Sequence, residues 1–192
     1  NTQVENVLQI SRLDRRELEL TTALIDPHIP IKTAIEHVRL LVDQREGSLH
    51  VSLDPLQIKL PLSESHMTNV WVNLLENAIK YGSEAGKVSV HAEPDGHEQI
   101  RVSISDDGPG IPAESLDRIF ERFFRVDKAR SRAQGGTGLG LSIVKHIAQT
   151  LGGRVWVESR MGKGTTFFFT LRASADLSAD SNTQAQRLRS VT

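Results

Sequence analysis

Four polar residues recur at helical spacing within the segment 64–80. Asn73, Glu76, Asn77 and Lys80 stand at positions i, i+3, i+4 and i+7, so they share one face of a helix. Asparagine is a poor helix former because its amide competes for nearby backbone hydrogen bonds, so two asparagines one turn apart need an explanation. Amide and carboxylate oxygens are hard ligands suited to Mg²⁺, and a lysine ammonium can meet phosphate charge. The stripe therefore indicates a site for magnesium and phosphate or, as the alternative, an ordinary solvated helix face.

Two glycine-rich loops offer a second part of such a site. The loop 106–111 follows a strand pattern directly and begins with Asp106, whose carboxylate can accept a hydrogen bond from an exocyclic amine such as that of adenine. The loop 135–141 runs straight into a helix pattern. Its glycines let the backbone approach a phosphate closely, and the N–H groups at a helix N-terminus attract anions. A Gly-Pro-Gly sequence is more often a simple turn, so the first loop alone leaves both interpretations open.

Neither loop matches a better-known nucleotide motif. A P-loop requires G-x-x-x-x-G-K-[ST], whereas Gly162-Lys163 is followed by Gly164 and lacks the upstream spacing. The dinucleotide fingerprint requires G-x-G-x-x-G, whereas Gly136, Gly138 and Gly140 are evenly spaced. We therefore interpret the pair of loops as a phosphate cradle of another kind.

The hydrophobic pattern predicts the elements that must position these residues. Apolar residues recur at helical spacing over 34–42, 64–80 and 138–151, with a shorter helix at 114–119 and glycines ending the longer ones. Alternation predicts strands at 49–53, 57–60, 88–92, 100–104, 155–157 and 167–171, with hairpins joining the last two pairs. Ser63 is expected to cap the helix 64–80, and Asp26-Pro27 and Pro30 are expected to break the segment before the first helix. We expect an α+β fold, a two-layer sandwich with helices on one face of a mixed, mostly antiparallel sheet.

Composition excludes several classes of protein. The 192 residues include 23 Lys and Arg against 24 Asp and Glu, so no excess positive charge points to nucleic acid. There is no cysteine, which fits a reducing compartment. No run approaches the roughly 18 apolar residues that span a bilayer, and the chain does not open with the pattern of a signal peptide. We expect a soluble, cytoplasmic chain that binds no nucleic acid.

Taken in order, these segments closely resemble the catalytic ATP-binding domain of bacterial sensor histidine kinases, part of the GHKL superfamily with the Bergerat fold. The N box is 73–81, the G1 box 106–111, the F box Phe120-Glu121-Arg122-Phe123-Phe124-Arg125, the G2 box 136–141 and a G3-like turn 162–167. The resemblance implies a catalytic domain over 24–172. It also implies that residues 1–20 are the end of a dimerisation and phosphoacceptor helical hairpin. The polar segment 173–192 is expected to be a disordered tail.

The resemblance also implies a role for each residue of the site. Asn77 would ligate Mg²⁺, Asn73 would lie beside the phosphates, Lys80 and Tyr81 would contact the nucleotide, and Asp106 would hold the adenine amine. Further nucleotide-binding positions are Gly108, Gly110, Ile111, Gly136, Thr137, Gly138, Leu139, Gly140, Leu141 and Thr165. Arg125 would reach toward the phosphate chain, and the loop 127–136 would be a lid over ATP. Phe120, Phe123 and Phe124 would anchor the near end of the lid, although a bare aromatic cluster is more often core.

One departure from the family, and one difference from the superfamily's ATP hydrolases, sharpen the prediction. None of the 7 histidines lies in the family's acceptor pattern of a helical His followed by an acid and then a Pro, so the acceptor helix is absent from this chain. In the superfamily's ATP hydrolases, a glutamate four residues before the magnesium asparagine serves as general base, and here that position is Asn73. An amide cannot take up a proton. Glu76 lies nearby and could polarise a nucleophile, but the pattern favours phosphoryl transfer over hydrolysis.

The leading hypothesis is the kinase portion of a two-component sensor histidine kinase. It would transfer the γ-phosphoryl of Mg-ATP to a histidine on a dimerisation domain of the same protein, from which a response regulator receives it. The parent would be a homodimer, and most relatives of this kind are anchored in the inner membrane. A GHKL module that binds nucleotide without transferring phosphate is the alternative, and a purely structural domain that binds no nucleotide is the third reading.

Overall fold

In the computed structural model, the described residues are 23–53, 60–96, 99–127 and 136–172. The predicted helical segment 1–20, the tail 173–192 and most of the predicted lid lie outside these ranges, as does most of the weak strand 57–60.

A five-stranded mixed sheet forms one layer of the molecule. Its strands are β2 (Ser48–Ser52), β4 (Lys87–Pro94), β5 (Gln99–Asp106), β6 (Val155–Ser159) and β7 (Thr165–Arg172), in the order β2-β4-β5-β7-β6. β2 runs parallel to β4, and every other neighbouring pair is antiparallel. The predicted hairpins β4–β5 and β6–β7 are thus confirmed. A separate pair, β1 (Ala23–Ile25) and β3 (Leu60–Leu62), is antiparallel and too short for the alternation of residue types to reveal it.

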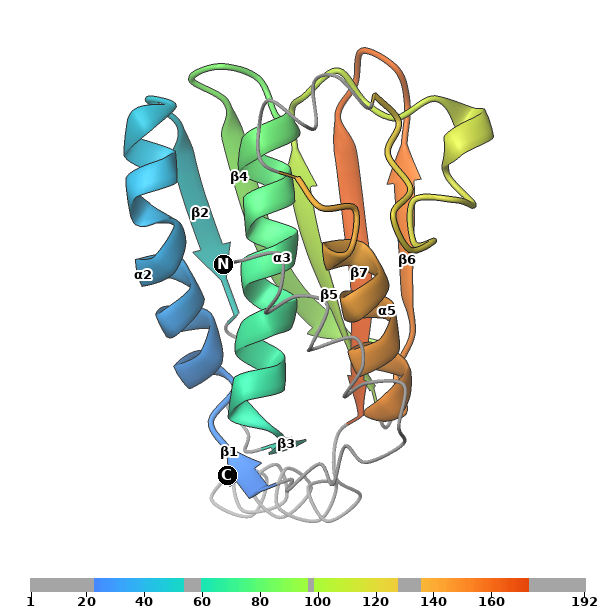
Figure 1. Ribbon diagram of the computed structural model, residues 1–192. Coiled ribbons are helices and arrows are strands. Elements are labelled where there is room, and N and C mark those ends of the chain that lie inside the picture. The colour runs from blue at the N-terminus through green and yellow to red at the C-terminus, as the bar shows by residue number, and fades with distance from the viewer. Residues whose placement is uncertain (1–22, 54–59, 97–98, 128–135, 173–192) are drawn as a thin grey trace, which may run out of the picture.

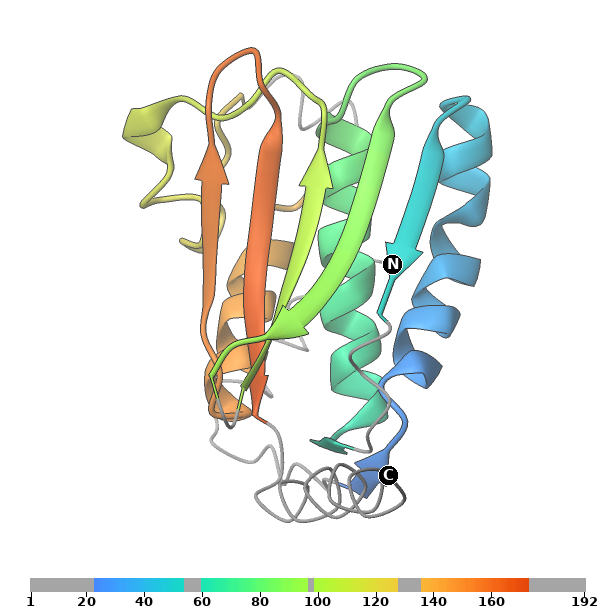
Figure 2. The ribbon, with the colours of Figure 1, turned by 180° about the vertical axis from the view of Figure 1, so that it is seen from behind.

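Three helices form the second layer. They are α2 (His28–Gln44), α3 (Glu64–Tyr81) and α5 (Gly140–Thr150), and all lie on the same face of the sheet, with α3 in the middle (Figures 1 and 2). None of the helices in the described ranges is long and apolar enough to cross a membrane. The predicted two-layer α+β sandwich is confirmed.

The core lies between α3 and the sheet. Trp71 of α3 is 1% exposed, and its ring meets that of Phe169 edge to face, with 5.1 Å between the centroids. Alternate residues of β5, such as Val102 and Ile104, are fully buried against the helices. Because Leu74 and Ala78 on the inner face of α3 are also fully buried, the polar stripe of the same helix has to face away from the sheet.

Local structure differs from the sequence prediction at four points. α2 begins at His28, before Pro30, and the first turn tolerates this proline because its missing N–H would have no helical partner there. Ser63 is the N-cap residue of α3 as predicted, but its side chain makes no capping hydrogen bond, because its Oγ pairs with His66 Nδ1 at 2.6 Å. The predicted helix 114–119 is only a short 3₁₀ turn, η2 (Ala113–Ser115), followed by turns. α5 starts at Gly140 instead of Gly138, because Gly138 has φ of 73°, in the left-handed region.

Candidate functional site

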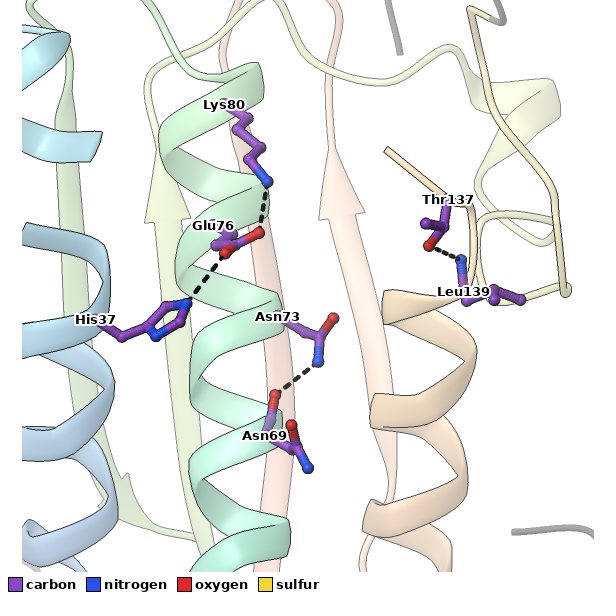
Figure 3. Close-up of polar contacts among 7 residues, drawn as sticks. All are labelled: His37, Asn69, Asn73, Glu76, Lys80, Thr137 and Leu139. Carbon is purple, nitrogen blue, oxygen red and sulfur yellow. Dashed lines mark hydrogen bonds and ion pairs between the residues drawn. The ribbon is translucent and has the colours of Figure 1, made fainter. Parts of the chain in front are cut away.

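The polar edge of α3 is organised around the carboxylate of Glu76. Lys80 Nζ lies 2.5 Å from Glu76 Oε2, and His37 Nε2 of α2 lies 3.6 Å from Glu76 Oε1 (Figure 3). One turn earlier, Asn73 Nδ2 donates to the backbone carbonyl of Asn69 at 2.8 Å. The predicted stripe therefore exists as a set of half-buried side chains on one edge. His37 was missed, because helical spacing within one element cannot reveal a neighbour on another helix.

The start of α5 approaches this edge closely. A Cβ added at Gly140 would lie only 2.4 Å from Asn73 Oδ1, so the Asn73 amide and the G2 backbone are in direct contact. The first N–H groups of a helix have no intrahelical partner, so those of α5 are open to an anion. Thr137 Oγ1 accepts a hydrogen bond from the Leu139 N–H at 3.3 Å (Figure 3). The Asn73 amide, Gly140 of the G2 box and the N-terminal end of α5 thus lie together.

The rest of the G2 box is held from both sides. Leu139 is 2% exposed and belongs to the core, whereas Gly136, Thr137 and Leu141 are half-buried. The N–H of Phe123 donates to the carbonyl of Gly138 at 2.8 Å, which ties the F box to the G2 box. Because a Cβ at Gly138 would lie 2.9 Å from the Phe123 backbone, only glycine fits this crossing.

The aromatic residues of the F box divide between core and surface. Phe120 meets Phe167 edge to face with 6.5 Å between centroids, and the guanidinium of Arg118 lies 4.4 Å from the centre of the Phe124 ring. Phe123 is 64% exposed and has φ of 63°, so its backbone makes the anchor and its ring does not. Arg125 is half-buried at the end of this segment, and no contact within the described residues brings it to the α3 edge.

Asp106 stands where β5 ends, beside the C-terminal end of α3. Its Oδ1 accepts a hydrogen bond from the Gly108 N–H at 2.9 Å. Burial raises the pKa of this carboxyl from 3.8 to about 6, against the opposing effect of the N–H groups of Gly108 and Thr165. A Cβ at Gly108 would lie 2.5 Å from the carbonyl oxygen of Tyr81, so the G1 loop rests directly on the last residue of α3.

The outer half of the G1 loop is fixed by the β6–β7 turn. Ile111 N–H donates to Ser159 Oγ at 2.9 Å, and the same Oγ lies 3.0 Å from Thr165 Oγ1. Gly110 has φ of 79° and leaves no room for a Cβ, which would lie 2.4 Å from the Arg160 carbonyl oxygen. The Ile111 N–H and the Thr165 hydroxyl therefore both contact Ser159 of the hairpin, while the Ile111 side chain packs against the core.

The donor set suits a magnesium ion that arrives with phosphate. No group of three or more His, Asp or Glu side chains that could hold a metal occurs in the part of the chain that the structure describes. Mg²⁺ commonly takes one or two protein ligands and fills its octahedron with phosphate oxygens and water. Asn77, one helical turn after Asn73 and half-buried, offers one such amide oxygen. The residues present thus fit a nucleotide with its divalent ion, and they do not form a closed metal site.

The fold and these loops define a nucleotide-binding α/β sandwich. The family model described as Histidine kinase-, DNA gyrase B-, and HSP90-like ATPase matches residues 63–175. The chain belongs to this family.

Relatives narrow the family to the histidine kinases. The chain is 34% identical over 169 residues to the sensor histidine kinase WalK of Bacillus subtilis, covering 88% of this chain and 28% of that protein. Staphylococcus epidermidis WalK is 35% identical over the same length, with 27% of that protein covered. The chain therefore spans little more than a quarter of these relatives. The predicted resemblance to a histidine kinase ATP-binding domain is confirmed.

Solved structures agree with this assignment. Full-length ShkA in complex with AMPPNP superimposes with a TM-score of 0.78 at 27% identity, covering 91% of this chain and 36% of that chain. The mycobacterial sensor histidine kinase MprB superimposes with a TM-score of 0.67 at 27% identity, covering 79% of this chain and 97% of that chain. The catalytic domain of the histidine kinase ThkA superimposes with a TM-score of 0.67 at 28% identity, covering 81% of this chain and 96% of that chain. The domain is thus an ATP-binding domain of the histidine kinase type.

Proposed function

We propose that this chain binds Mg-ATP and transfers the γ-phosphoryl group to a histidine on a separate dimerisation domain, as the kinase portion of a two-component sensor histidine kinase. The observation that carries the proposal is the contact between the Asn73 amide and the Gly140 backbone, with 2.4 Å from Oδ1 to a Cβ added at that glycine. This contact sets the polar edge of α3 against the anion-binding end of α5.

Each side chain has one task in this proposal. Asn77 ligates Mg²⁺, whose chemistry is to neutralise phosphate charge during transfer. Asn73 lies beside the phosphates, Lys80 adds positive charge, and Asp106 accepts the hydrogen bond of the adenine amine. The remaining contacts come from Tyr81, from Gly108, Gly110 and Ile111 of G1, from the backbone of 136–141, and from Thr165. Arg125 is assigned to the phosphate chain by the resemblance alone.

The side chains of Asn73 and Glu76 on α3 favour transfer of the phosphoryl group over hydrolysis of ATP. The amide of Asn73 cannot serve as a base for water. Glu76 Oε2 is engaged by Lys80 at 2.5 Å, which makes this carboxylate less available as a base for water than an unpaired one. In the reaction, a histidine nitrogen forms a bond to the γ-phosphorus while the bond to the bridging oxygen breaks and ADP leaves. Positioning and charge neutralisation then supply most of the catalysis.

The partners follow from the same proposal. They are the phosphoacceptor domain of the parent protein, a response regulator that receives the phosphoryl group, and a second copy of the parent in a homodimer. We place the domain in the cytoplasm, and we propose that the parent is anchored in the inner membrane.

The direct test mixes this chain with Mg-ATP labelled at the γ-phosphate and a dimerisation fragment that carries the acceptor histidine. Acid-labile, alkali-stable label on the fragment is the expected result, with none when the acceptor histidine is changed to glutamine. The chain alone should acquire no label. Nucleotide binding without transfer to any supplied fragment would favour the alternative, a module that only binds nucleotide. Failure to bind nucleotide at all would reject both.

A further inference from the structure

The segment that leaves α3 is held in place by Asp107, the second carboxylate of the G1 box. Asp107 Oδ2 accepts a hydrogen bond from the Lys87 N–H at 2.9 Å, and Oδ1 accepts from the Ser83 N–H at 3.4 Å. The Asp107 carbonyl accepts from Ser83 Oγ at 2.8 Å. The two adjacent carboxylates therefore serve different groups, because Asp106 accepts from the Gly108 N–H of its own loop.

The loop 82–87 is shaped around this carboxylate. A Cβ at Gly86 would lie 2.5 Å from Asp107 Oδ1 and 2.6 Å from the Ser83 carbonyl oxygen. Only glycine leaves enough space for the Asp107 side chain inside the loop. Asp107 is exposed, so solvent screens its charge, and of the two N–H contacts that anchor the loop to it, the 2.9 Å hydrogen bond from Lys87 is the better formed.

This anchor reaches the residues assigned to the nucleotide. Gly82 follows Tyr81 directly, and a Cβ at Gly82 would lie 3.7 Å from the Asp106 Cβ. Arg45, at the C-terminal end of α2, donates from Nη2 to the Lys80 carbonyl at 2.9 Å, and its own carbonyl accepts from the Ala85 N–H at 2.9 Å. A cation at the last carbonyls of a helix also complements its dipole. The last turn of α3 is thus fixed between α2 and the G1 box.

We propose that Asp107 is a positioning residue for nucleotide binding. It touches neither adenine nor phosphate. By fixing the exit of α3, it sets the distance between Asp106 and the last turn that carries Lys80 and Tyr81. This inference rests on the proposed function, since it assumes that those residues contact ATP.

The test compares Asp107→Asn and Asp107→Ala with wild type and with Asp43→Asn, a control that removes one carboxylate charge from an exposed position on α2. Each protein is first shown to be folded by urea denaturation, and Mg-ATP and Mg-ADP affinities are then measured at a temperature where all are native. The alanine variant loses both N–H contacts and should bind nucleotide about tenfold more weakly, the cost of roughly one charge-assisted hydrogen bond. The asparagine variant keeps one acceptor oxygen, so its nucleotide affinity should lie between those of the alanine variant and wild type.

A second readout separates positioning from stability alone. In the transfer assay, the variants should raise the KM for ATP while kcat at saturating ATP stays within about twofold, because the chemical groups are intact. Backbone amide exchange at Ser83 and Lys87 should accelerate. If folded Asp107→Ala binds nucleotide within twofold of wild type, the positioning role is rejected. If wild type itself binds no ATP, the proposed function fails first.

Discussion

Replacing Asp106 with asparagine should stabilise the fold at neutral pH while removing the acceptor charge of the site. Burial raises the pKa of this carboxyl from 3.8 to about 6, so the folded state disfavours the ionised form. Each pKa unit corresponds to about 1.4 kcal/mol, so the full rise corresponds to about 3 kcal/mol at neutral pH. The carboxylate keeps some contact with solvent, which reduces the expected effect to about 1–2 kcal/mol.

The sign of the pH dependence follows from proton binding. Between pH 3.8 and about 6 the folded protein binds more protons at Asp106 than the unfolded chain does, so this residue's contribution to stability declines as the pH rises. The variant lacks this decline. The free energy of unfolding of Asp106→Asn minus that of wild type should therefore grow by about 1–2 kcal/mol from pH 4 to pH 7.5.

Urea denaturation at several pH values measures this difference directly. If the amide of Asp106→Asn forms weaker hydrogen bonds than the carboxyl does, the difference in unfolding free energy shifts by the same amount at every pH. The change of that difference with pH therefore reports the ionisation of Asp106 alone. Nucleotide affinity of the variant should fall at pH 7.5, because the variant lacks the carboxylate that we propose as the acceptor for the adenine amine. A difference in unfolding free energy that stays constant from pH 4 to 7.5, or that shrinks as the pH rises, would refute the argument that burial makes this carboxylate costly.

Three further predictions concern other parts of the domain. Gly140→Ala should weaken Mg-ATP binding at least about tenfold in an equilibrium titration, because the new Cβ would lie 2.4 Å from Asn73 Oδ1. Unchanged affinity would show that this contact is not part of the nucleotide site. The pKa of His66 is lowered by burial first and by the charge of His146 second, so the free energy of unfolding should decline as the pH falls below 6.5. His66→Asn should flatten that decline in urea denaturation between pH 7.5 and 5. Chelation of Mg²⁺ should weaken ATP binding strongly in wild type and less in Asn77→Ala; an equal loss in both would remove Asn77 from the metal site.

Much of the fold could be predicted because its elements carry strong periodic patterns. The helix 64–80 and both hairpins match α3, β4–β5 and β6–β7 to within a few residues. The pattern failed where tertiary contact decides the backbone. Gly138 adopts a left-handed conformation to cross Phe123, which delays α5 by two residues, and the segment 114–119 lacks the length to sustain a helix.

The candidate site was predictable where residue type is unusual for its element. Two asparagines in one helix, and glycines at a helix start, stand out from the sequence itself. His37, Arg45 and Asp107 did not stand out, because each acts through contacts with residues distant in sequence. Asp107 reads as one more acid in a turn until the N–H groups of Ser83 and Lys87 are seen to point at it.

The most direct test of the central claim is a titration with Mg-ATP followed by amide NMR. The side-chain amides of Asn73 and Asn77 and the backbone amides of Gly108 and Gly140 should shift together, with one dissociation constant. Shifts confined to one of these groups, or no shift at millimolar Mg-ATP, would contradict a single site formed by the α3 edge and the glycine loops.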